Sequence, residues 1–372
     1  MKNYLFVLGR DPELSKIEIE SYFEGKNEEY QILDSNDSII SIKLKELKQE
    51  VIHDLGGTVK IAEVISATLR PDEIEQNLEK YDIYKGTSNK TEYYVTGYNT
   101  GILDIVEDYL KDYFKRIKVK ATHRHEGEPT KLIKKEYKEK VVDVVVFKNQ
   151  VGVTVAVTDV IEQKERDLGR PNVDYMKVIS IRLAKILVNL SKARSGNTIL
   201  DPFCGSGTIL QESMLRGINV IGMDIDKEAI KQTTENLEWL KTTYGIKTSY
   251  VLHNKNSRDT SKFVKTMING VVTEPYMGPY IRKLPNMMEA RETIEELREI
   301  YSNLLSEIYN ILKPGSRVAM VVPRLKTLEG KSVAMDFENM AKEHKYTLAY
   351  RPVLYGSNKN KLGREIYVLE RN

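Results

Sequence analysis

The chain has 372 residues, of which 41% are hydrophobic and 30% are charged, and its formal net charge at pH 7 is only +3. This length corresponds to two or three domains, and the composition provides enough apolar residues for a core in each. No apolar run approaches the ~18 residues that cross a bilayer, so we expect no membrane partner. The single cysteine, Cys204, excludes an intrachain disulfide and a cysteine-based zinc site. We therefore expect a cytoplasmic protein.

The N-terminal part alternates short strand patterns with amphipathic helix patterns. They occur in the order β-α-β-β-α-β, at residues 4–9, 11–23, 29–33, 38–43, 44–55 and 61–65. Pro12 stands in the first turn of the first helix, and Gly56-Gly57 is a helix-stop signal. This order predicts a small ferredoxin-like domain over residues 1–66.

A second α+β segment is predicted over residues 67–160. Its expected elements are a helix over 102–114 and strands near 119–121, 141–148 and 151–158. Within it, the stretch Lys115–Lys140 holds ten Lys or Arg residues and four acidic ones. Such a run is usually a solvated helix or hairpin, but it also provides the clustered cations that nucleic-acid phosphates require. His123 and His125 have no further ligand in register, so we expect no metal site.

The remainder of the chain alternates strands and helices. Residues 161–174 are expected to be a linker, and a long helix over about 175–191 opens a domain over 175–372. Strands are predicted at 198–201, 219–223, 248–253, 269–273, 317–322 and 364–370. This alternation predicts an α/β domain with a Rossmann-like, doubly wound sheet.

The first motif of this domain is Asp201-Pro-Phe-Cys-Gly-Ser-Gly207, an apolar strand that enters a Gly-x-Gly turn before a helix. Glycines allow a sharp turn and close approach of a ligand. A dinucleotide site would have a third glycine where Leu210 stands. The carboxylate of Asp201 instead suits the ammonium group of a bound amino-acid moiety, directly or through water. The motif predicts S-adenosylmethionine as cofactor, contacted by Asp201, Phe203, Gly205 and Gly207, with Cys204 as a packed side chain.

Two further strand ends carry polar residues. Asp224 follows the second strand, where an acidic side chain accepts hydrogen bonds from both ribose hydroxyls. Asp226, two residues further on, is expected to cap the next helix. Asn256, with Ser257 beside it, follows the third strand and is expected to accept a hydrogen bond from the adenine amino group; a plain loop asparagine is the alternative.

The fourth strand ends in Thr273-Glu274-Pro275-Tyr276. Amino-group methyltransferases carry Asp/Asn/Ser-Pro-Pro-Tyr/Phe there, because acceptors hold the amine while the aromatic ring stacks on a flipped base. In this chain Thr273 and Glu274 stand in place of the Asp and the first Pro. We therefore expect Thr273 or Glu274, with a backbone carbonyl, to hold the amine and Tyr276 to stack on the base. A strand-end turn retained for packing is the alternative.

With these motifs, the chain resembles the THUMP-domain RNA methyltransferases, in particular the tRNA guanosine-10 N2-methyltransferase family. The resemblance covers nearly the whole chain. It is carried by Tyr4–Ser15, Leu55–Glu63, Arg166–Pro171, Leu183–Leu190 and, most specifically, Asp201–Gly207. The chain departs from the family's Asp-Pro-Pro-Tyr at Thr273–Tyr276.

The resemblance implies an N-terminal ferredoxin-like domain, a THUMP domain over residues 67–160 and a class I methyltransferase domain. It further implies that the THUMP domain binds the 3′ acceptor end of tRNA, with Arg124, Lys131, Lys134 and Lys135 as RNA contacts. The implied activity is methylation of the N2 amine of a guanosine in tRNA, such as position 10. Two alternatives remain, an RNA-binding protein that keeps the cofactor but has lost or altered catalysis, and a DNA amino-methyltransferase.

Overall fold

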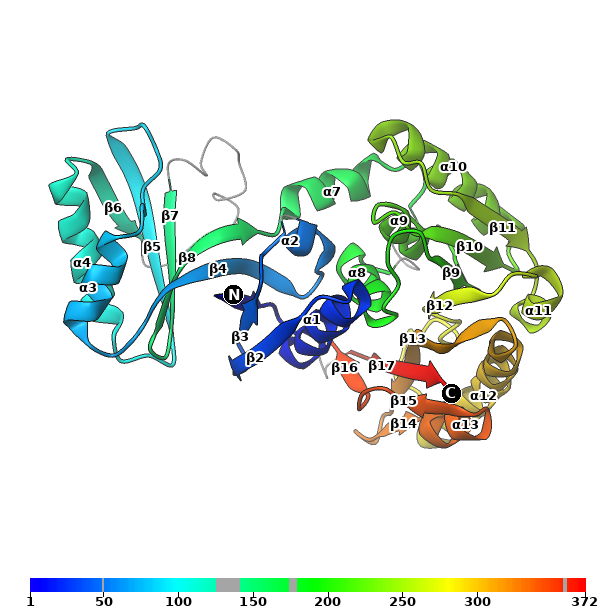
Figure 1. Ribbon diagram of the computed structural model, residues 1–372. Coiled ribbons are helices and arrows are strands. Elements are labelled where there is room, and N and C mark those ends of the chain that lie inside the picture. Colours follow the sequence, from blue (N-terminus) through cyan, green and yellow to red (C-terminus); the bar gives the residue numbers. More distant parts are fainter. Residues whose placement is uncertain (49, 125–140, 174–178, 357–359) are drawn as a thin grey trace. The chain divides into compact units, whose positions relative to one another are not determined.

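The computed structural model describes residues 1–48, 50–124, 141–173, 179–356 and 360–372 (Figure 1). The chain divides into two compact units. Unit 1 contains Met1–Lys16 and Glu29–Arg166, and unit 2 contains Ile17–Glu28 and Asp167–Asn372. No described helix is both long enough and apolar enough to cross a bilayer.

Unit 1 is built on one sheet of eight described strands in the order β2-β3-β1-β4-β8-β7-β5-β6. The strands are β1 (Lys2–Leu8), β2 (Tyr30–Ser35), β3 (Ile39–Leu44), β4 (Thr58–Ala67), β5 (Lys90–Tyr98), β6 (Lys120–Arg124), β7 (Val141–Phe147) and β8 (Gln150–Val157). The helices that begin in this part of the chain are α1 (Pro12–Lys26), α2 (Glu50–Asp54), α3 (Pro71–Glu79), α4 (Leu103–Arg116) and α7 (Val160–Gly169).

The ferredoxin-like order predicted for the N-terminal part is confirmed. Its four strands lie antiparallel in the order β2-β3-β1-β4. The expected boundary between residues 66 and 67 falls inside β4, whose other edge pairs with β8, so one sheet continues across it. The second half of α1, from Ile17, belongs to unit 2.

Two sequence predictions in unit 1 differ from the structure. The helix expected over 44–55 is wrong in its first half, because Leu44 is the last residue of β3, pairs with Lys2 and is buried, which leaves α2 only from Glu50. The linker expected over 161–174 is mostly helical, since α7 extends to Gly169. The apolar and charged residues of α7 follow a helical period. The turn-forming residues Gly169 to Pro171 led to the prediction of a linker instead.

Unit 2 is built on a second sheet, in the order β11-β10-β9-β12-β13-β17-β15, with β14 beside β13 and β16 beside β17. Its strands are β9 (Thr198–Asp201), β10 (Asn219–Asp224), β11 (Tyr250–Asn254), β12 (Ile268–Thr273), β13 (Leu312–Lys326), β14 (Ser332–Ala334), β15 (Tyr346–Leu348), β16 (Val353–Tyr355) and β17 (Leu362–Arg371). Its helices are α8 (Ile181–Leu190), α9 (Thr208–Met214), α10 (Lys227–Tyr244), η1 (Ser257–Asp259), α11 (Thr260–Phe263), α12 (Met287–Tyr309) and α13 (Phe337–Glu343).

The strands β9 to β13 are parallel, and β17 runs antiparallel to β13. The chain adds β10 and β11 on one side of β9 and then returns to add β12 and β13 on the other. The predicted doubly wound sheet is therefore confirmed. In such sheets the order reverses at a switch point, and ligands bind outside the carboxyl ends of the strands there. Here that point lies between β9 and β12.

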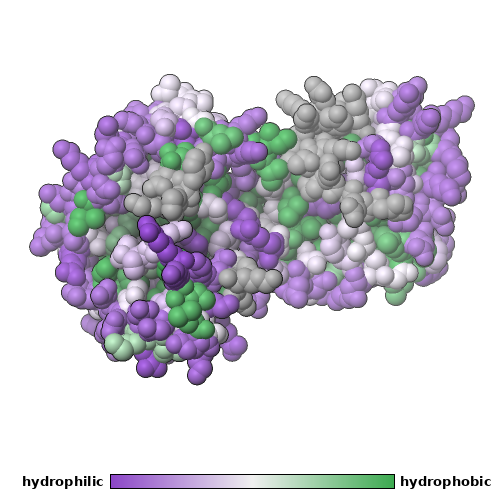
Figure 2. All heavy atoms as spheres, turned by 180° about the vertical axis from the view of Figure 1, so that it is seen from behind, coloured by the Kyte–Doolittle hydropathy of each residue, from purple (hydrophilic) through white to green (hydrophobic). Residues whose placement is uncertain are grey.

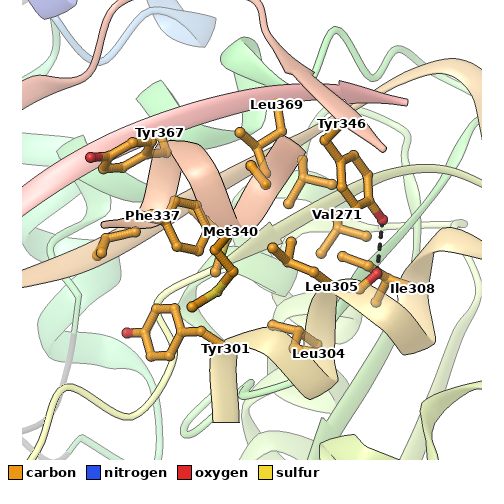
Figure 3. Packing of buried hydrophobic residues seen from close by; sticks show 14 of the residues in the cluster. Val271, Tyr301, Leu304, Leu305, Ile308, Phe337, Met340, Tyr346, Tyr367 and Leu369 are labelled. Carbon is orange, nitrogen blue, oxygen red and sulfur yellow. Dashed lines mark hydrogen bonds between the residues drawn. The ribbon is translucent and has the colours of Figure 1, made fainter. Parts of the chain in front are cut away.

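The core on one side of this sheet holds α12 and α13 against β13 and β17 (Figure 3). Phe337 packs edge-on against both Tyr301 and Tyr367, with ring centroids 6.0 and 4.8 Å apart. The buried hydroxyl of Tyr346 donates to the backbone carbonyl of Leu305 at 3.1 Å, the bond drawn in Figure 3. A buried aromatic cluster with a satisfied hydroxyl fixes α12 beside the sheet, and this places Tyr301 near the carboxyl end of β12.

Candidate cofactor and acceptor site

The glycine-rich loop joins β9 to α9 and requires its glycines. Gly205 and Gly207 have φ angles of +51° and +84°, in the left-handed region that side chains disfavour. A Cβ atom at Gly207 would lie 2.9 Å from Cγ2 of Thr233, whereas one at Gly205 would meet no atom within 4 Å. The loop therefore packs tightly against α10 at Gly207 and leaves open space at Gly205, where a ligand can approach the backbone.

Two buried residues of α10 hold this loop. The hydroxyl of Thr233 donates to the carbonyl of Gly205 at 2.5 Å, and the amide of Asn236 donates to the carbonyl of Ser206 at 2.9 Å. Asn236 also exchanges two hydrogen bonds with the backbone of Asn172, each 2.9 Å long. Fully satisfied buried amides of this kind fix a unique geometry, so the loop is preformed.

Asp224, at the end of β10, contacts the loop directly. One carboxylate oxygen accepts the N–H of Gly205 at 3.0 Å, and the other accepts the N–H of Asp226 at 2.9 Å. Asp226 itself accepts the N–H of Glu228 at 2.9 Å at the start of α10, which confirms its interpretation as a helix cap. Asp224 is half-buried beside the open space at Gly205, and its role as a ribose ligand stays a prediction.

The end of β11 is hydrogen-bonded to the end of β10. Asn254 lies opposite Asp224 in the parallel pairing, and its amide donates to the carbonyl of Asp224 at 3.1 Å. Asn256 is half-buried, and its side-chain oxygen accepts the N–H of Arg258 at 3.0 Å, so it caps the short helix η1 that Ser257 begins. An oxygen has two lone pairs, so this bond leaves one for an adenine amino group, and that role of Asn256 and Ser257 stays a prediction.

Asp201 is buried at the end of β9 and meets Thr273 at the end of β12. Its Oδ1 accepts the hydroxyl of Thr273 at 2.8 Å and the N–H of Phe203 at 3.2 Å. Burial raises the pKa of Asp201 to about 7; the two hydrogen bonds oppose the rise, and the charges of Asp224 and Glu274 add to it. Thr273 is fully buried, and its hydroxyl points to Asp201 at the start of the glycine loop.

Glu274 is the first residue beyond the strand. Its side chain is 12% exposed, and its Oε1 lies 2.5 Å from Nε of Arg364 on β17. Pro275 is buried, whereas the side chain of Tyr276 is 52% exposed. The carbonyl of Tyr276 accepts the hydroxyl of the buried Tyr301 at 3.3 Å. The motif therefore presents one carboxylate and one free aromatic ring at the edge of the sheet.

Two residues of this site were not predicted from the sequence. Arg364 lies 90 positions after Glu274, and Tyr301 lies 25 positions after Tyr276. Tyr301 lies within the helical pattern of α12, and Arg364 lies within the strand pattern of β17. Neither residue therefore belongs to a local motif. Only the pairing of β17 with β13 and the packing of α12 bring them to the motif.

The remaining predicted residues lie elsewhere or outside the described ranges. Arg124 is exposed at the end of β6 and pairs with Glu92 at 2.7 Å. Lys131, Lys134 and Lys135 fall outside the described residues. Cys204 is 5% exposed, and burial raises the pKa of its thiol well above the ordinary value, as a packing residue requires. Within the described ranges no three His, Cys, Asp or Glu side chains are placed to share a metal ion.

Comparisons with known proteins identify related sequences and folds. Residues 173–349 match the family model of the RMKL-like methyltransferase domain. The chain is 34% identical over 155 residues to the tRNA (guanine(10)-N2)-dimethyltransferase of Methanothermobacter thermautotrophicus, covering 42% of this chain and 41% of that protein. It is 29% identical over 170 residues to the enzyme of that name from Methanocaldococcus jannaschii, covering 42% and 45%. The chain thus spans less than half the length of these two relatives.

The fold is also found among solved structures. The crystal structure of TrmN from Thermus thermophilus aligns over 100% of both chains with a TM-score of 0.52 and 16% identity. The structure of a possible methylase from Clostridium difficile 630 aligns over 98% of this chain and 97% of its own, with a TM-score of 0.50 and 14% identity. Likeness at this level concerns the fold. Residues 173–349 are therefore similar to the RMKL-like methyltransferase domain, the chain shares the fold of these two solved structures, and part of it is similar in sequence to the tRNA (guanine(10)-N2)-dimethyltransferases.

Proposed function

We propose that the chain is an S-adenosylmethionine-dependent methyltransferase that modifies the N2 amine of a guanosine in tRNA, such as position 10. One observation carries the proposal: the carboxyl ends of β9, β10 and β12 bring Asp201, Asp224 and Glu274 to one edge of the sheet, beside a preformed glycine loop. The resemblance in sequence to tRNA (guanine(10)-N2)-dimethyltransferases supports the choice of substrate.

The loop fits the proposed cofactor. The space at Gly205 admits a ligand against the backbone, and Asp224 offers acceptor oxygens beside it for the ribose hydroxyls. Asp201 supplies negative charge behind the loop for an ammonium group, directly or through water. Asn256 and Ser257 follow the next strand, where the adenine ring is expected. When bound, S-adenosylmethionine supplies an electrophilic methyl group on a positively charged sulfur.

The acceptor side is formed by Glu274 to Tyr276. The lone pair of a guanine N2 amine is delocalised into its ring, so the amine is a weak nucleophile. The carboxylate of Glu274 accepts one N–H of the amine and stabilises the positive charge that develops on nitrogen as the N–C bond forms and the S–C bond breaks. The nitrogen then loses a proton to Glu274 or to water. The exposed ring of Tyr276 stacks on the flipped base, and orientation supplies much of the rate.

Thr273 has a positioning role in this scheme. Its hydroxyl donates to Asp201, and this bond supports a role for Thr273 in holding Asp201 rather than the amine. The structure therefore favours Glu274 as the acidic residue of the motif, in place of the family's Asp. Its pairing with Arg364 holds the carboxylate in one orientation.

The same ion pair also favours a second candidate, an RNA-binding protein with lost or altered catalysis, since Arg364 partly neutralises the acceptor. The test is incubation with methyl-labelled S-adenosylmethionine and tRNA, followed by mass spectrometry of nucleosides. We expect N2-methylated guanosine. Binding of both cofactor and tRNA without label on any RNA would instead support the second candidate.

The same assay with DNA tests which class of nucleic acid is the substrate. The same assay with duplex and single-stranded DNA of matched length is expected to give no label. Transfer to DNA and not to tRNA would overturn the assignment of tRNA as substrate.

A further inference from the structure

Three segments of unit 2 meet beside the acceptor motif, namely residues 276–289, 326–331 and 360–364. The N–H of Leu328 donates to the carbonyl of Pro285 at 2.9 Å, and Nζ of Lys361 donates to the carbonyl of Arg282 at 2.6 Å. The N–H of Lys326 donates to the carbonyl of Lys361 at 3.0 Å. The three segments therefore form one surface, which we call the 280 surface.

The 280 surface exposes three large, mainly apolar side chains. Tyr280 is 74% exposed, Leu328 is 67% exposed and Tyr276 is 52% exposed. The ring of Tyr280 makes no aromatic contact with a described residue. Figure 2 shows one face of the molecule, on which hydrophobic residues are scattered among hydrophilic ones. Two exposed tyrosine rings and a leucine on one surface are candidates for contact with a partner.

The charge of the 280 surface is positive. Arg282, Lys283, Lys326, Lys331 and Lys361 lie on it, and none forms an ion pair with a described residue. Its carboxylates are Glu289 and Glu329. Glu289 accepts the N–H of Asn286 at 2.8 Å, and Glu329 accepts the N–H of Met287 at 3.2 Å. Both carboxylates bond to the beginning of α12, and the five cations outnumber these two acids by three, so the surface can attract a polyanion.

The position of the 280 surface relates it to the reaction. Tyr280 follows Tyr276 by four residues, across a turn at Gly278 with a φ of +98°. Tyr301 anchors this turn, since its hydroxyl contacts the carbonyl of Tyr276 at 3.3 Å and Sδ of Met277 at 3.6 Å. A methyl acceptor must reach the carboxyl end of β12, so the nucleotides next to it pass over these residues. Four glutamates and one arginine, Glu292, Glu295, Glu296, Glu299 and Arg298, line one shallow depression on α12, and its net negative charge disfavours RNA there.

We propose that the 280 surface binds an unstacked RNA segment next to the target nucleotide. A neighbouring base stacks on Tyr280 and contacts Leu328, and Arg282, Lys283 and the three lysines bind the adjoining phosphates. This inference rests on the proposed function and adds to it an RNA site within the catalytic unit, separate from the basic stretch Lys115–Lys140. It assigns to Tyr280 a part in substrate binding and none in the chemical step.

The first test compares Tyr280→Ala with Tyr280→Phe, which keeps the ring. The probe is an in vitro transcribed tRNA with guanosine at position 10, and the readouts are equilibrium tRNA binding, KM and kcat for tRNA, and S-adenosylmethionine affinity. Loss of one stacked base is expected to weaken tRNA binding and raise KM about 10-fold. Tyr280→Phe should stay within about 2-fold of wild type. Unchanged tRNA binding by Tyr280→Ala would overturn the proposal.

The second test addresses the cations. Arg282→Ser combined with Lys283→Ser should weaken tRNA binding and reduce the slope of log affinity against log salt by about 1 to 2. The matched control is Lys265→Ser with Lys313→Ser, which removes two exposed cations at the amino ends of β12 and β13, the opposite edge of the sheet. Equal effects of the two double variants would contradict a localised surface.

These tests are distinguishable from failure of the proposed function. If the wild-type protein transfers no methyl group to any RNA, the proposed function fails, and equilibrium binding still decides whether RNA docks at the 280 surface. If methyl transfer occurs but Tyr280→Ala and the cation variant bind tRNA as wild type does, only the present inference fails.

Discussion

The hydroxyl of Thr273 donates a 2.8 Å hydrogen bond to the buried carboxylate of Asp201, so the last residue of β12 supports the last residue of β9. The two strands are neighbours in the sheet, although the residues are 72 positions apart. An aspartate at position 273 would place two carboxylates within hydrogen-bonding distance, and one of them would have to be protonated. A threonine avoids this repulsion and leaves Glu274 as the carboxylate that we propose as the contact of the methyl acceptor.

Replacement of Thr273 by valine should separate the two roles considered for this residue. Valine keeps the shape but loses the hydroxyl, so Asp201 loses a hydrogen bond that lowers its pKa. We expect the unfolding free energy to fall by about 1–2 kcal/mol. We also expect the variant to reach the wild-type affinity for S-adenosylmethionine only at a higher pH, as measured by calorimetry between pH 6 and 8. Thr273→Ser is the control and should behave as wild type; a valine variant that matches wild type in both measurements would contradict the support role.

The raised pKa of Asp201 predicts how stability depends on pH. Its folded-state pKa is about 7, against an ordinary value of 3.8, so the folded protein holds this proton more tightly than the unfolded chain. Stability contributed by protonated Asp201 is therefore lost as pH rises from about 4 to 7, by at most about 4 kcal/mol. Urea unfolding from pH 4 to 8 measures this slope. In Asp201→Asn the slope should flatten, and an unchanged slope would show that Asp201 titrates normally.

Asp224→Ala should abolish detectable binding of S-adenosylmethionine. The variant loses the proposed acceptor for the ribose and also the acceptor that holds the N–H of Gly205. Asp226→Ala is the matched control two residues away, because that carboxylate caps α10. The control should lose about 1 kcal/mol of stability and keep its affinity. Calorimetry with unchanged affinity in Asp224→Ala would mean that the ribose assignment is wrong.

A side chain at Gly222 in β10 should lower the free energy of unfolding. A Cβ atom there would lie 2.6 Å from Leu210, 2.7 Å from Leu252 and 3.2 Å from the sulfur of Cys204. Gly222→Ala is expected to cost about 1–3 kcal/mol by overpacking beneath the cofactor loop. Gly101→Ala is the control, since a Cβ atom there meets no atom within 4 Å. Similar melting temperatures for the two variants would show that the loop shifts freely.

Much of the catalytic unit follows from local sequence. An apolar strand that enters Asp201–Gly207, with Asp224 at the end of the next strand, is sufficient to predict the parallel sheet and the cofactor loop. Because the carboxyl ends of parallel strands lie at one edge, motifs at strand ends come together without knowledge of the loops. The helix cap at Asp226 is likewise a local signal, since it depends on backbone groups two residues away.

The tertiary structure decided the contacts within the acceptor motif and the path of the N-terminal elements. The sequence could not tell that Thr273 bonds to Asp201 and Glu274 to Arg364, because these contacts depend on the strand register and on the position of the last strand. It likewise could not place the second half of α1 in unit 2 or join β4 to β8. Local patterns report backbone periodicity and turn chemistry, whereas these features depend on partners far away in the chain, which only packing and strand pairing select.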